Sequence, residues 1–221
     1  MKYLIVLLFV LSGCTSKETK PTIRVATDVK TMYGDKFPQN IKYNALVRLY
    51  KKGQFRCSAF IIDANYAITA GHCAEVGEQN MELYDVVDNK TNTNVSCVAS
   101  DHTRDVALLQ GDFDSFDFFP VDFTGENQSA MTGTPLFMCG FPAGGGDFCS
   151  QTVFNRLVAI NGRFVVLVES GQLYPGMSGG PVLDMVQRKI IGVNSSVATD
   201  HIFIGSLLGL DGTFGIKRYD K

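Results

Sequence analysis

The spacing of its apolar runs is the feature that most restricts how this chain can fold. Short apolar runs follow one another closely, are separated by Gly, Asn and Asp, and show no sustained 3.6-residue period. This pattern predicts an all-β barrel or sandwich. The expected strands are residues 44–50, 55–62, 66–70, 82–87, 95–99 and 106–109, followed by 135–139, 152–160, 163–168, 181–184, 189–193 and 202–207.

Turn residues lie where this pattern requires them. Residues 51–53, 63–65 and 88–90 each separate two expected strands and are rich in Gly, Asp, Asn and Lys. Asn161-Gly162 between two apolar runs is a strong signal for a two-residue hairpin. The turns therefore predict mainly antiparallel neighbours.

Composition and one unusual segment indicate how the chain is organised. An apolar fraction of 45% and a charged fraction of 19% in 221 residues are typical of a globular protein with one or two compact units. Acidic residues alternate with phenylalanines over residues 111–133, which predicts a connection between two units whose phenylalanines pack against both. The net charge of −2 gives no support for nucleic-acid binding.

The N-terminus has the features of an export signal. Lys2 precedes a continuous apolar run over residues 3–10, and Leu11-Ser12-Gly13 leads into Cys14. This arrangement resembles a bacterial lipoprotein signal, which implies that residues 1–13 are removed and that Cys14 is lipidated. An ordinary secretory signal with a chance cysteine is the alternative. We expect residues 14–41 to form the lipidated cysteine and a polar tether.

The lipoprotein resemblance also implies a location. An exported, lipidated chain is extracytoplasmic and anchored to a bacterial membrane. Thr15 follows the cysteine, where an Asp would favour retention at the inner membrane in Gram-negative bacteria. The periplasmic face of the outer membrane is therefore the expected site in such a host.

Five cysteines remain after Cys14, at positions 57, 73, 97, 139 and 149. Export permits disulfides. Because five is an odd number, at least one cysteine stays reduced or pairs between chains. Metal binding is set aside, since no Cys-x-x-Cys spacing occurs.

Residues 175–181 frame a single serine, Ser178, with Pro and Gly on both sides. Glycine lets the backbone turn so that successive N–H groups point inward together. Such a serine suits a nucleophile beside an oxyanion hole, in which backbone N–H groups bind the negative charge of an attacked carbonyl. A surface turn of Gly, Pro and Ser is the alternative reading, and this motif alone does not exclude it.

Two upstream residues support the nucleophile reading. His72 follows the expected strand 66–70 on a turn of small residues, a setting that His102 and His201 lack. Asp105 precedes the apolar run 106–109, where it could accept the Nδ1–H of a histidine. Asp101, followed by polar residues, is the weaker candidate for that role.

The motifs Thr-Ala-Gly-His-Cys, Asp-Val-Ala-Leu-Leu and Gly-Met-Ser-Gly-Gly-Pro, in this order, resemble the trypsin-like, chymotrypsin-fold serine proteases. The resemblance covers residues 42–209, and the compact spacing is similar to the bacterial branch that includes the high-temperature-requirement family. It implies two antiparallel six-stranded β-barrels with the active site between them. The implied parts are residues 42–111 for the first barrel, 112–134 for the connection and 135–221 for the second barrel.

The resemblance also implies roles for individual residues. Ser178 is expected to be the nucleophile, His72 the general base and then acid, and Asp105 the acid that orients the histidine. The backbone N–H groups of Gly176 and Ser178 are expected to form the oxyanion hole. No cofactor and no metal is implied, and the expected partner is a protein or peptide substrate.

The disulfide predictions have two sources. Cys57–Cys73 is implied by the family position. Cys139–Cys149 closes a short loop around Gly144-Gly145-Gly146 and has no family counterpart. These pairings leave Cys97 reduced.

Two departures from the family pattern affect regulation and specificity. Met177 replaces the Asp that pairs with a newly cut N-terminus, which argues against zymogen control. Gln172 stands where trypsins carry an acidic residue, so a pocket for small or medium uncharged side chains is expected. Asp184 or Asp200 could reverse this preference by reaching into the pocket. The expected pocket residues are Gln172, Leu173, Tyr174, Asn194, Ser195 and Ser196.

Two other functions remain alternatives. Gly-x-Ser-x-Gly around Ser178 also matches the nucleophile elbow of α/β-hydrolase esterases, with His201 as the histidine. That fold requires a helix after the serine, whereas Gly-Gly-Pro follows it here. The second alternative is a catalytically silent binding module on the protease fold, because a fold alone does not prove an activity.

Overall fold

The structure is a computed structural model that describes residues 45–119, 121, 123, 132–160, 163–168, 171–184, 186, 189–198, 201–207 and 214. The predicted signal and tether, Cys14 included, lie outside these residues, as do Asn161-Gly162 and Asp200. Within the ranges listed, no helix is long and apolar enough to cross a membrane.

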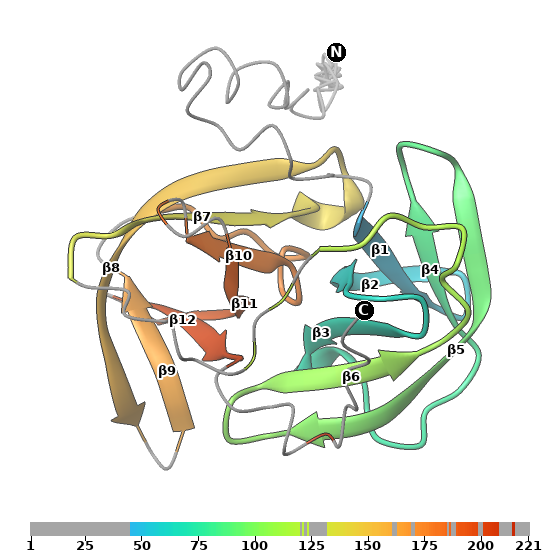
Figure 1. Ribbon diagram of the computed structural model, residues 1–221, viewed down its shortest axis with the longest axis horizontal. Helices are drawn as coiled ribbons and strands as arrows, with labels where there is room; N and C mark the ends of the chain where they lie inside the picture. Colours follow the sequence, from blue (N-terminus) through green and yellow to red (C-terminus); the bar gives the residue numbers. More distant parts are fainter. Residues whose placement is uncertain are drawn as a thin grey trace, which may run out of the picture.

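The first half of the chain forms a closed antiparallel barrel with the strand order β1-β2-β3-β6-β5-β4, at the right of Figure 1. Each strand pairs with the next along this order, and the β1–β4 pair closes the barrel. Its strands are β1 (Leu46–Lys51), β2 (Gln54–Ile61), β3 (Tyr66–Ala70), β4 (Met81–Asp85), β5 (Lys90–Asp101) and β6 (Val106–Gln110).

The second half forms another closed antiparallel barrel, with the order β10-β11-β12-β9-β8-β7, at the left of Figure 1. Its strands are β7 (Pro135–Gly140), β8 (Phe148–Ile160), β9 (Arg163–Val168), β10 (Pro181–Asp184), β11 (Lys189–Ala198) and β12 (His201–Ser206). Two six-stranded barrels confirm the predicted all-β, chymotrypsin-like fold class.

All twelve predicted strands are present, but β5, β8 and β11 are each at least four residues longer than predicted. β5 begins at Lys90, whereas the apolar run begins at Val95. The polar residues between them pair in register with β4, as Thr91 does with Tyr84 and Asn92 with Leu83. Backbone hydrogen bonds rather than side-chain burial hold this extension, so the apolar pattern did not reveal it. β8 and β11 are also longer than predicted, and their extensions pair with β7 and β12.

The larger hydrophobic core runs through both barrels. It contains residues of β1–β6 together with Phe137, Phe141 and Val193 of the second half. Phenylalanines of the connecting segment join it: Phe113, Phe116, Phe119 and Phe123 are all buried. Full burial of one such ring contributes about 1.5–3 kcal/mol. These four rings therefore belong to one core with residues of both barrels, whereas Phe118 is exposed.

Candidate active site

Strand pairing in the first barrel brings His72 and Asp105 together. β3 and β6 are antiparallel neighbours, and Ala70 at the end of β3 pairs with Val106 at the start of β6. The residues just beyond this pair must therefore also be close. They are the short 3-10 turn Gly71–Cys73, which carries His72, and the turn that ends at Asp105.

Asp105 contacts His72 through both carboxylate oxygens. Oδ1 accepts the backbone N–H of His72 at 2.8 Å, and Oδ2 lies 2.8 Å from the ring Nδ1. Ser195 Oγ donates a third hydrogen bond to Oδ2 at 2.5 Å. Asp105 has a φ of 56°, a left-handed conformation that a non-glycine residue rarely adopts. The backbone is thus held in an uncommon state that aims the carboxylate at the imidazole.

The hydrogen bonds determine the charge state of Asp105. Its side chain is only 14% exposed, and this burial acts to raise the pKa of the carboxyl group. The hydrogen bonds from His72 and Ser195 outweigh burial, and the pKa of Asp105 is lowered. Asp105 is therefore a carboxylate at neutral pH, suited to fixing the imidazole tautomer.

Asp101, the weaker candidate for this role, has another function in the structure. Its Oδ1 accepts the backbone N–H groups of Thr103 and Arg104 at 2.9 and 3.1 Å. Arg104 also forms an ion pair with its Oδ2. Asp101 thus stabilises the turn that precedes Asp105 and is not paired with His72.

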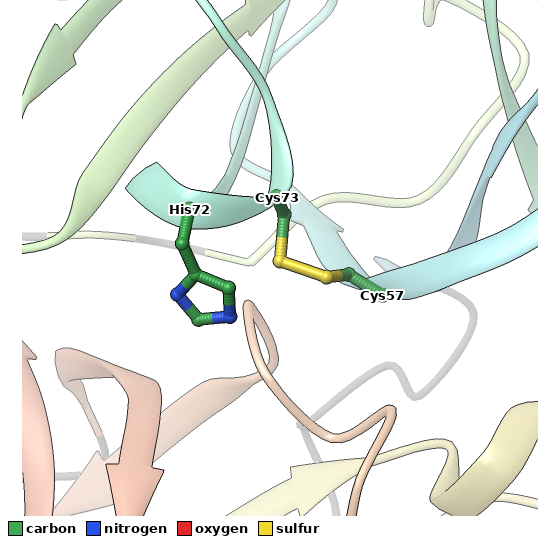
Figure 2. Close-up of side chains that lie close together, drawn as sticks. All are labelled: Cys57, His72 and Cys73. Atoms are coloured by element: carbon green, nitrogen blue, oxygen red, sulfur yellow. A yellow bond between two sulfur atoms is a disulfide. The ribbon is translucent and has the colours of Figure 1, made fainter.

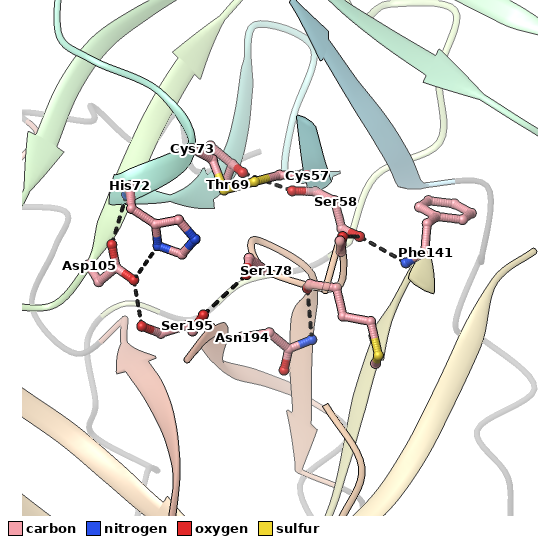
Figure 3. The surroundings of a disulfide bond; sticks show 12 residues. Cys57, Ser58, Thr69, His72, Cys73, Asp105, Phe141, Ser178, Asn194 and Ser195 are labelled. Carbon is pink, nitrogen blue, oxygen red and sulfur yellow. Dashed lines mark hydrogen bonds and ion pairs between the residues drawn. A yellow bond between two sulfur atoms is a disulfide. The ribbon is translucent and has the colours of Figure 1, made fainter. Parts of the chain in front are cut away.

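Ser178 comes from the second barrel and faces the imidazole of His72 (Figure 3). It is partly buried in the turn before β10. Its hydroxyl donates to the carbonyl of Ser195 at 3.2 Å. Among the described residues no hydrogen bond joins Ser178 Oγ to His72. Rotation about χ1 redirects the hydroxyl, and such bonds often tighten only when substrate is bound.

The backbone of residues 175–180, the nucleophile loop, is almost completely hydrogen-bonded. Its acceptors and donors bond to one another, to both barrels and to residues 141–145, a tight turn that follows β7 and is called the 141–145 turn below. The bonds are Ala143 N to Pro175 O, Ser58 Oγ to Gly176 O, Gly180 N and Asn194 Nδ2 to Met177 O, Ser58 N to Ser178 O, Asn194 N to Gly180 O, Met177 N to Tyr174 O and Gly179 N to Asn194 O.

Within this loop the N–H groups of Gly176 and Ser178 are the only backbone donors that have no acceptor among the described residues. The carbonyl of Pro175 points to Ala143 N at 2.7 Å, so the N–H of Gly176 in the same trans peptide points the opposite way. Gly176 has a φ of 95°, which glycine adopts without strain. Because backbone donors are normally satisfied, two free donors flanking one serine suit the binding of an anionic oxygen.

The residues expected to line the pocket divide into two groups. Asn194 is fully buried, and its amide donates to Cys139 O at 2.7 Å and to Met177 O at 3.3 Å. The hydroxyl of Ser195 donates a hydrogen bond to the carboxylate of Asp105. These two side chains hold the site together instead of forming a pocket wall, whereas Ser196 is exposed on β11.

The segment before the nucleophile loop is partly exposed. Gln172 donates its backbone N–H to Ser150 Oγ at 2.7 Å, and its side-chain oxygen accepts from the hydroxyl of Tyr174 at 2.9 Å. Leu173 packs against the second, smaller core. No formal charge lies among these three residues. Asp184 is one of the acids that could reverse the specificity. It is buried at the C-terminal end of β10, whereas Ser178 precedes the N-terminal end, Pro181.

Both predicted disulfides are present, and Cys97 is reduced and buried. Cys57–Cys73 joins β2 to the turn beside His72 (Figure 2). Cys57, His72 and Cys73 also lie close enough together to share a metal ion. With the two sulfur atoms bonded to each other, no thiolate is available as a ligand, and the group is not a metal site.

Ser58 is a site residue that the sequence analysis missed. It is fully buried in β2, and its hydroxyl bonds to Gly176 and also to Phe141, which Figure 3 shows beside it. One sequence signal was available: Ser58 follows Cys57, whose predicted bridge leads to the residue next to His72.

Comparison with known proteins agrees with this architecture. The family described as the trypsin-like peptidase domain matches residues 57–193. No curated protein matches the chain in sequence.

Several solved proteases share the fold. The inactive form of the Rv3671c protease of M. tuberculosis is 21% identical with a TM-score of 0.63, over 78% of this chain and 90% of that one. A serine endoprotease from Yersinia pestis is 20% identical with a TM-score of 0.61, over 77% of this chain and 60% of that one. The HtrA-type protease AlgW with a decapeptide is 16% identical with a TM-score of 0.61, over 74% and 61%.

These likenesses show the fold alone, because the identities are low. The family match shows more than the fold, because it covers more than half of the chain and contains His72, Asp105 and Ser178. Together with the two barrels, it makes this protein a member of the trypsin-like peptidase family.

Proposed function

We propose that this protein is a serine endopeptidase that hydrolyses peptide bonds with Ser178, His72 and Asp105. The observation that carries the proposal is the Asp105 carboxylate holding the imidazole of His72 opposite Ser178, which lies beside two N–H groups without an acceptor. A binding module would have no need for this combination of an oriented base, a facing hydroxyl and free donors.

The residues support a two-step acyl transfer. Nε2 of His72 takes the proton of Ser178 as Oγ attacks the carbonyl carbon of the substrate. The negative charge on the carbonyl oxygen is bound by the N–H groups of Gly176 and Ser178. His72 then gives its proton to the leaving amine, and water hydrolyses the acyl-enzyme by the same route. Asp105 accepts Nδ1–H throughout and stabilises the imidazolium.

A free strand edge supports a peptide substrate. β10 pairs with β11 only as far as Val193, and the backbone of Asn194 bonds to Gly179 and Gly180 of the nucleophile loop, so residues 196–198 of β11 pair with β12 alone among the described strands. Ser196 and Val197 are exposed there, next to Ser195, whose carbonyl contacts Ser178. An extended peptide can add to such an edge by backbone hydrogen bonds. This mode of binding would lay the backbone of a peptide beside Ser178, which supports a peptide substrate.

We further propose a preference for small or medium uncharged side chains on the acyl side of the cut. Gln172, Leu173 and Ser196 carry no charge, and burying a charged side chain against such walls costs several kcal/mol without compensation. Cleavage of a peptide library is expected to show cuts after residues such as Val, Ala or Leu. Dominant cuts after Lys or Arg would contradict this preference.

Export and anchoring through Cys14 are also part of the proposal, on the sequence of residues 1–14. Radiolabelled palmitate is expected to be incorporated into the wild-type chain and not into the Cys14→Ser variant in a bacterial host. Equal labelling of both chains, or of neither, would contradict lipidation at Cys14.

The activity is tested with a serine-directed phosphonate and a casein or peptide assay. Wild-type protein is expected to be labelled at Ser178 and to hydrolyse the substrate, and Ser178→Ala is expected to do neither while remaining folded. Folded wild-type protein that is not labelled and does not cleave would favour the silent binding module. The esterase alternative is wrong, because the α/β-hydrolase fold requires a helix after the nucleophile, whereas strand β10 begins three residues after Ser178.

A further inference from the structure

Ser58 of β2 has an unusual set of hydrogen bonds. Its hydroxyl donates to the carbonyl of Gly176 at 2.8 Å and accepts the backbone N–H of Phe141 at 2.9 Å. Its own N–H donates to the carbonyl of Ser178 at 2.9 Å. Ser58 therefore joins the first barrel to the nucleophile loop at two carbonyls, and to the start of the 141–145 turn.

These contacts bear on the direction of the Gly176 N–H. The carbonyl before Gly176 is held by Ala143, and the carbonyl of Gly176 itself is held by Ser58. Holding both carbonyls fixes the two peptide planes that flank Gly176. The Ser58 hydroxyl also holds Phe141, which opens the turn that presents Ala143. Both restraints on Gly176 thus depend on the same hydroxyl.

Other contacts make Ser58 a rigid attachment point. It has no exposed surface. Cys57, its neighbour, is bonded to Cys73 beside His72. The 141–145 turn is held from the first barrel a second time, because Arg48 of β1 donates to Gly145 O at 2.6 Å and lies over the Phe141 ring. A buried, fully bonded hydroxyl has few alternative positions.

We propose that Ser58 is a positioning residue of the oxyanion hole, acting through Gly176 and Phe141. This inference rests on the proposed peptidase function. Ser58 does not touch the substrate or the reacting atoms; it keeps the Gly176 N–H aimed at the place where the oxyanion forms. Losing one oxyanion donor costs about 10²–10³ in rate, and misplacing it costs less than losing it.

The test compares Ser58→Ala with wild type on a peptide amide substrate. We expect kcat to fall about 10- to 100-fold with KM changed less than about threefold, because the hole acts in the transition state. The rate of phosphonate labelling should fall in proportion. The acid side of the pH profile of kcat/KM should not move, since Ser58 contacts neither His72 nor Asp105. Ser58→Cys, which is slightly larger and a weak donor, is measured alongside and serves if Ser58→Ala is not recovered folded.

Thr69→Val is the matched control. It removes a buried hydroxyl that bonds to Ser58 O and leaves the bonds of Gly176 and Phe141 in place. Similar losses of thermal stability in the two variants, with a fall in kcat only for the Ser58 variant, would support positioning. Parallel losses of kcat in both variants, or an unchanged kcat in Ser58→Ala, would overturn it while leaving the peptidase function intact. An inactive, unlabelled wild-type protein would overturn both.

Discussion

The two barrels contribute different kinds of structure to the candidate site. The first barrel supplies a pair of side chains, His72 and Asp105, which are joined at the adjacent ends of β3 and β6. The second barrel supplies the nucleophile loop, residues 175–180, in which backbone groups rather than side chains are positioned. Ser178 is the one side chain of that loop expected to react.

This difference predicts two kinds of sensitivity. The acid–base pair depends on the charge and the hydrogen bonds of two side chains, so a single isosteric substitution can disable it. The nucleophile loop depends on backbone geometry and close packing, so an added Cβ can disable it without removing any reactive group. Substitutions in each part therefore distinguish chemical from geometric contributions.

The largest effect is expected in the acid–base pair. His72→Ala should lower kcat/KM at least about 10⁴-fold, and His72→Ala with Ser178→Ala should lose little more, because the groups act as a unit. His102→Ala, at an exposed histidine outside the site, is the control and should keep wild-type activity. Additive losses in steady-state kinetics of the double variant would contradict a shared mechanism.

Asp105→Asn separates charge from shape in the same pair. We expect kcat to fall about 10⁴-fold, because the amide cannot serve as the anionic acceptor of Nδ1–H. Asp101→Asn is the control, since Asp101 is not paired with His72. Equal kinetic losses in the two variants would contradict the assignment of Asp105.

Asp105 also predicts a pH dependence of stability. Burial opposes its ionisation, but the hydrogen bonds from His72 and Ser195 lower its folded pKa below the ordinary value of 3.8. The carboxylate therefore stabilises the folded state above about pH 4, and this contribution is lost as the pH falls through the lowered pKa. Urea unfolding between pH 2 and 6 should show a smaller acid-induced loss for Asp105→Asn than for wild type. An identical dependence of the unfolding free energy on pH in the two proteins would contradict this linkage.

Gly179→Ala tests the geometric requirement of the nucleophile loop. Its Cβ would lie 2.1 Å from Ser58 O, at a φ of 85°. We expect a loss of about 3 kcal/mol or more in unfolding free energy, together with most of the activity. Gly77→Ala is the matched control, with a φ of 86° and no atom within 4 Å of the added Cβ, and should lose only the cost of the left-handed backbone, about 1–2 kcal/mol. Similar urea midpoints for the two variants would show that close packing around residue 179 is not the cause of the lost stability.

Ser195→Ala tests how the second barrel supports the acid–base pair of the first. It removes one hydrogen bond to Asp105 and keeps both bonds to His72. We expect a fall of about tenfold in kcat, at the lower end of what a hydrogen bond to a charged group contributes. Ser115→Ala, at an exposed serine of the connecting segment outside the site, is the control. A loss as large as that of Asp105→Asn would mean that Ser195 has a more direct role.

The smallest effect on activity is expected at Cys97, which belongs to neither part. Burial raises the pKa of its thiol to about 11, with the carboxylate of Glu78 adding to the shift and a hydrogen bond to Ala99 O opposing it. The folded protein should therefore resist iodoacetamide at pH 8 and react in urea. Cys97→Ala should keep wild-type kcat. Rapid labelling of the folded protein by iodoacetamide, as detected by mass spectrometry, would contradict the buried position.

Much of the fold could be predicted from the sequence because it depends on local pattern, and the motifs that carry the family resemblance named the candidate residues of the site. Apolar runs separated by turn residues located all twelve strands, since side-chain burial and turn geometry are read over a few positions. The Gly-rich frame of Ser178 and the strand before His72 were visible for the same reason. The polar extension of β5 was missed because its residues are held by a partner strand and not by burial.

The supporting contacts were decided only by the tertiary structure. Ser195 and Asp105 are 90 residues apart in sequence, and Ser58 and Gly176 are 118 apart. Asn194 and Ser195 were expected in a pocket wall, yet their side chains bond to a buried carbonyl and to Asp105. A serine or asparagine can donate to many acceptors, and its own sequence neighbourhood does not specify which one. Barrel closure and strand register bring one acceptor within reach, and these are properties of the whole chain.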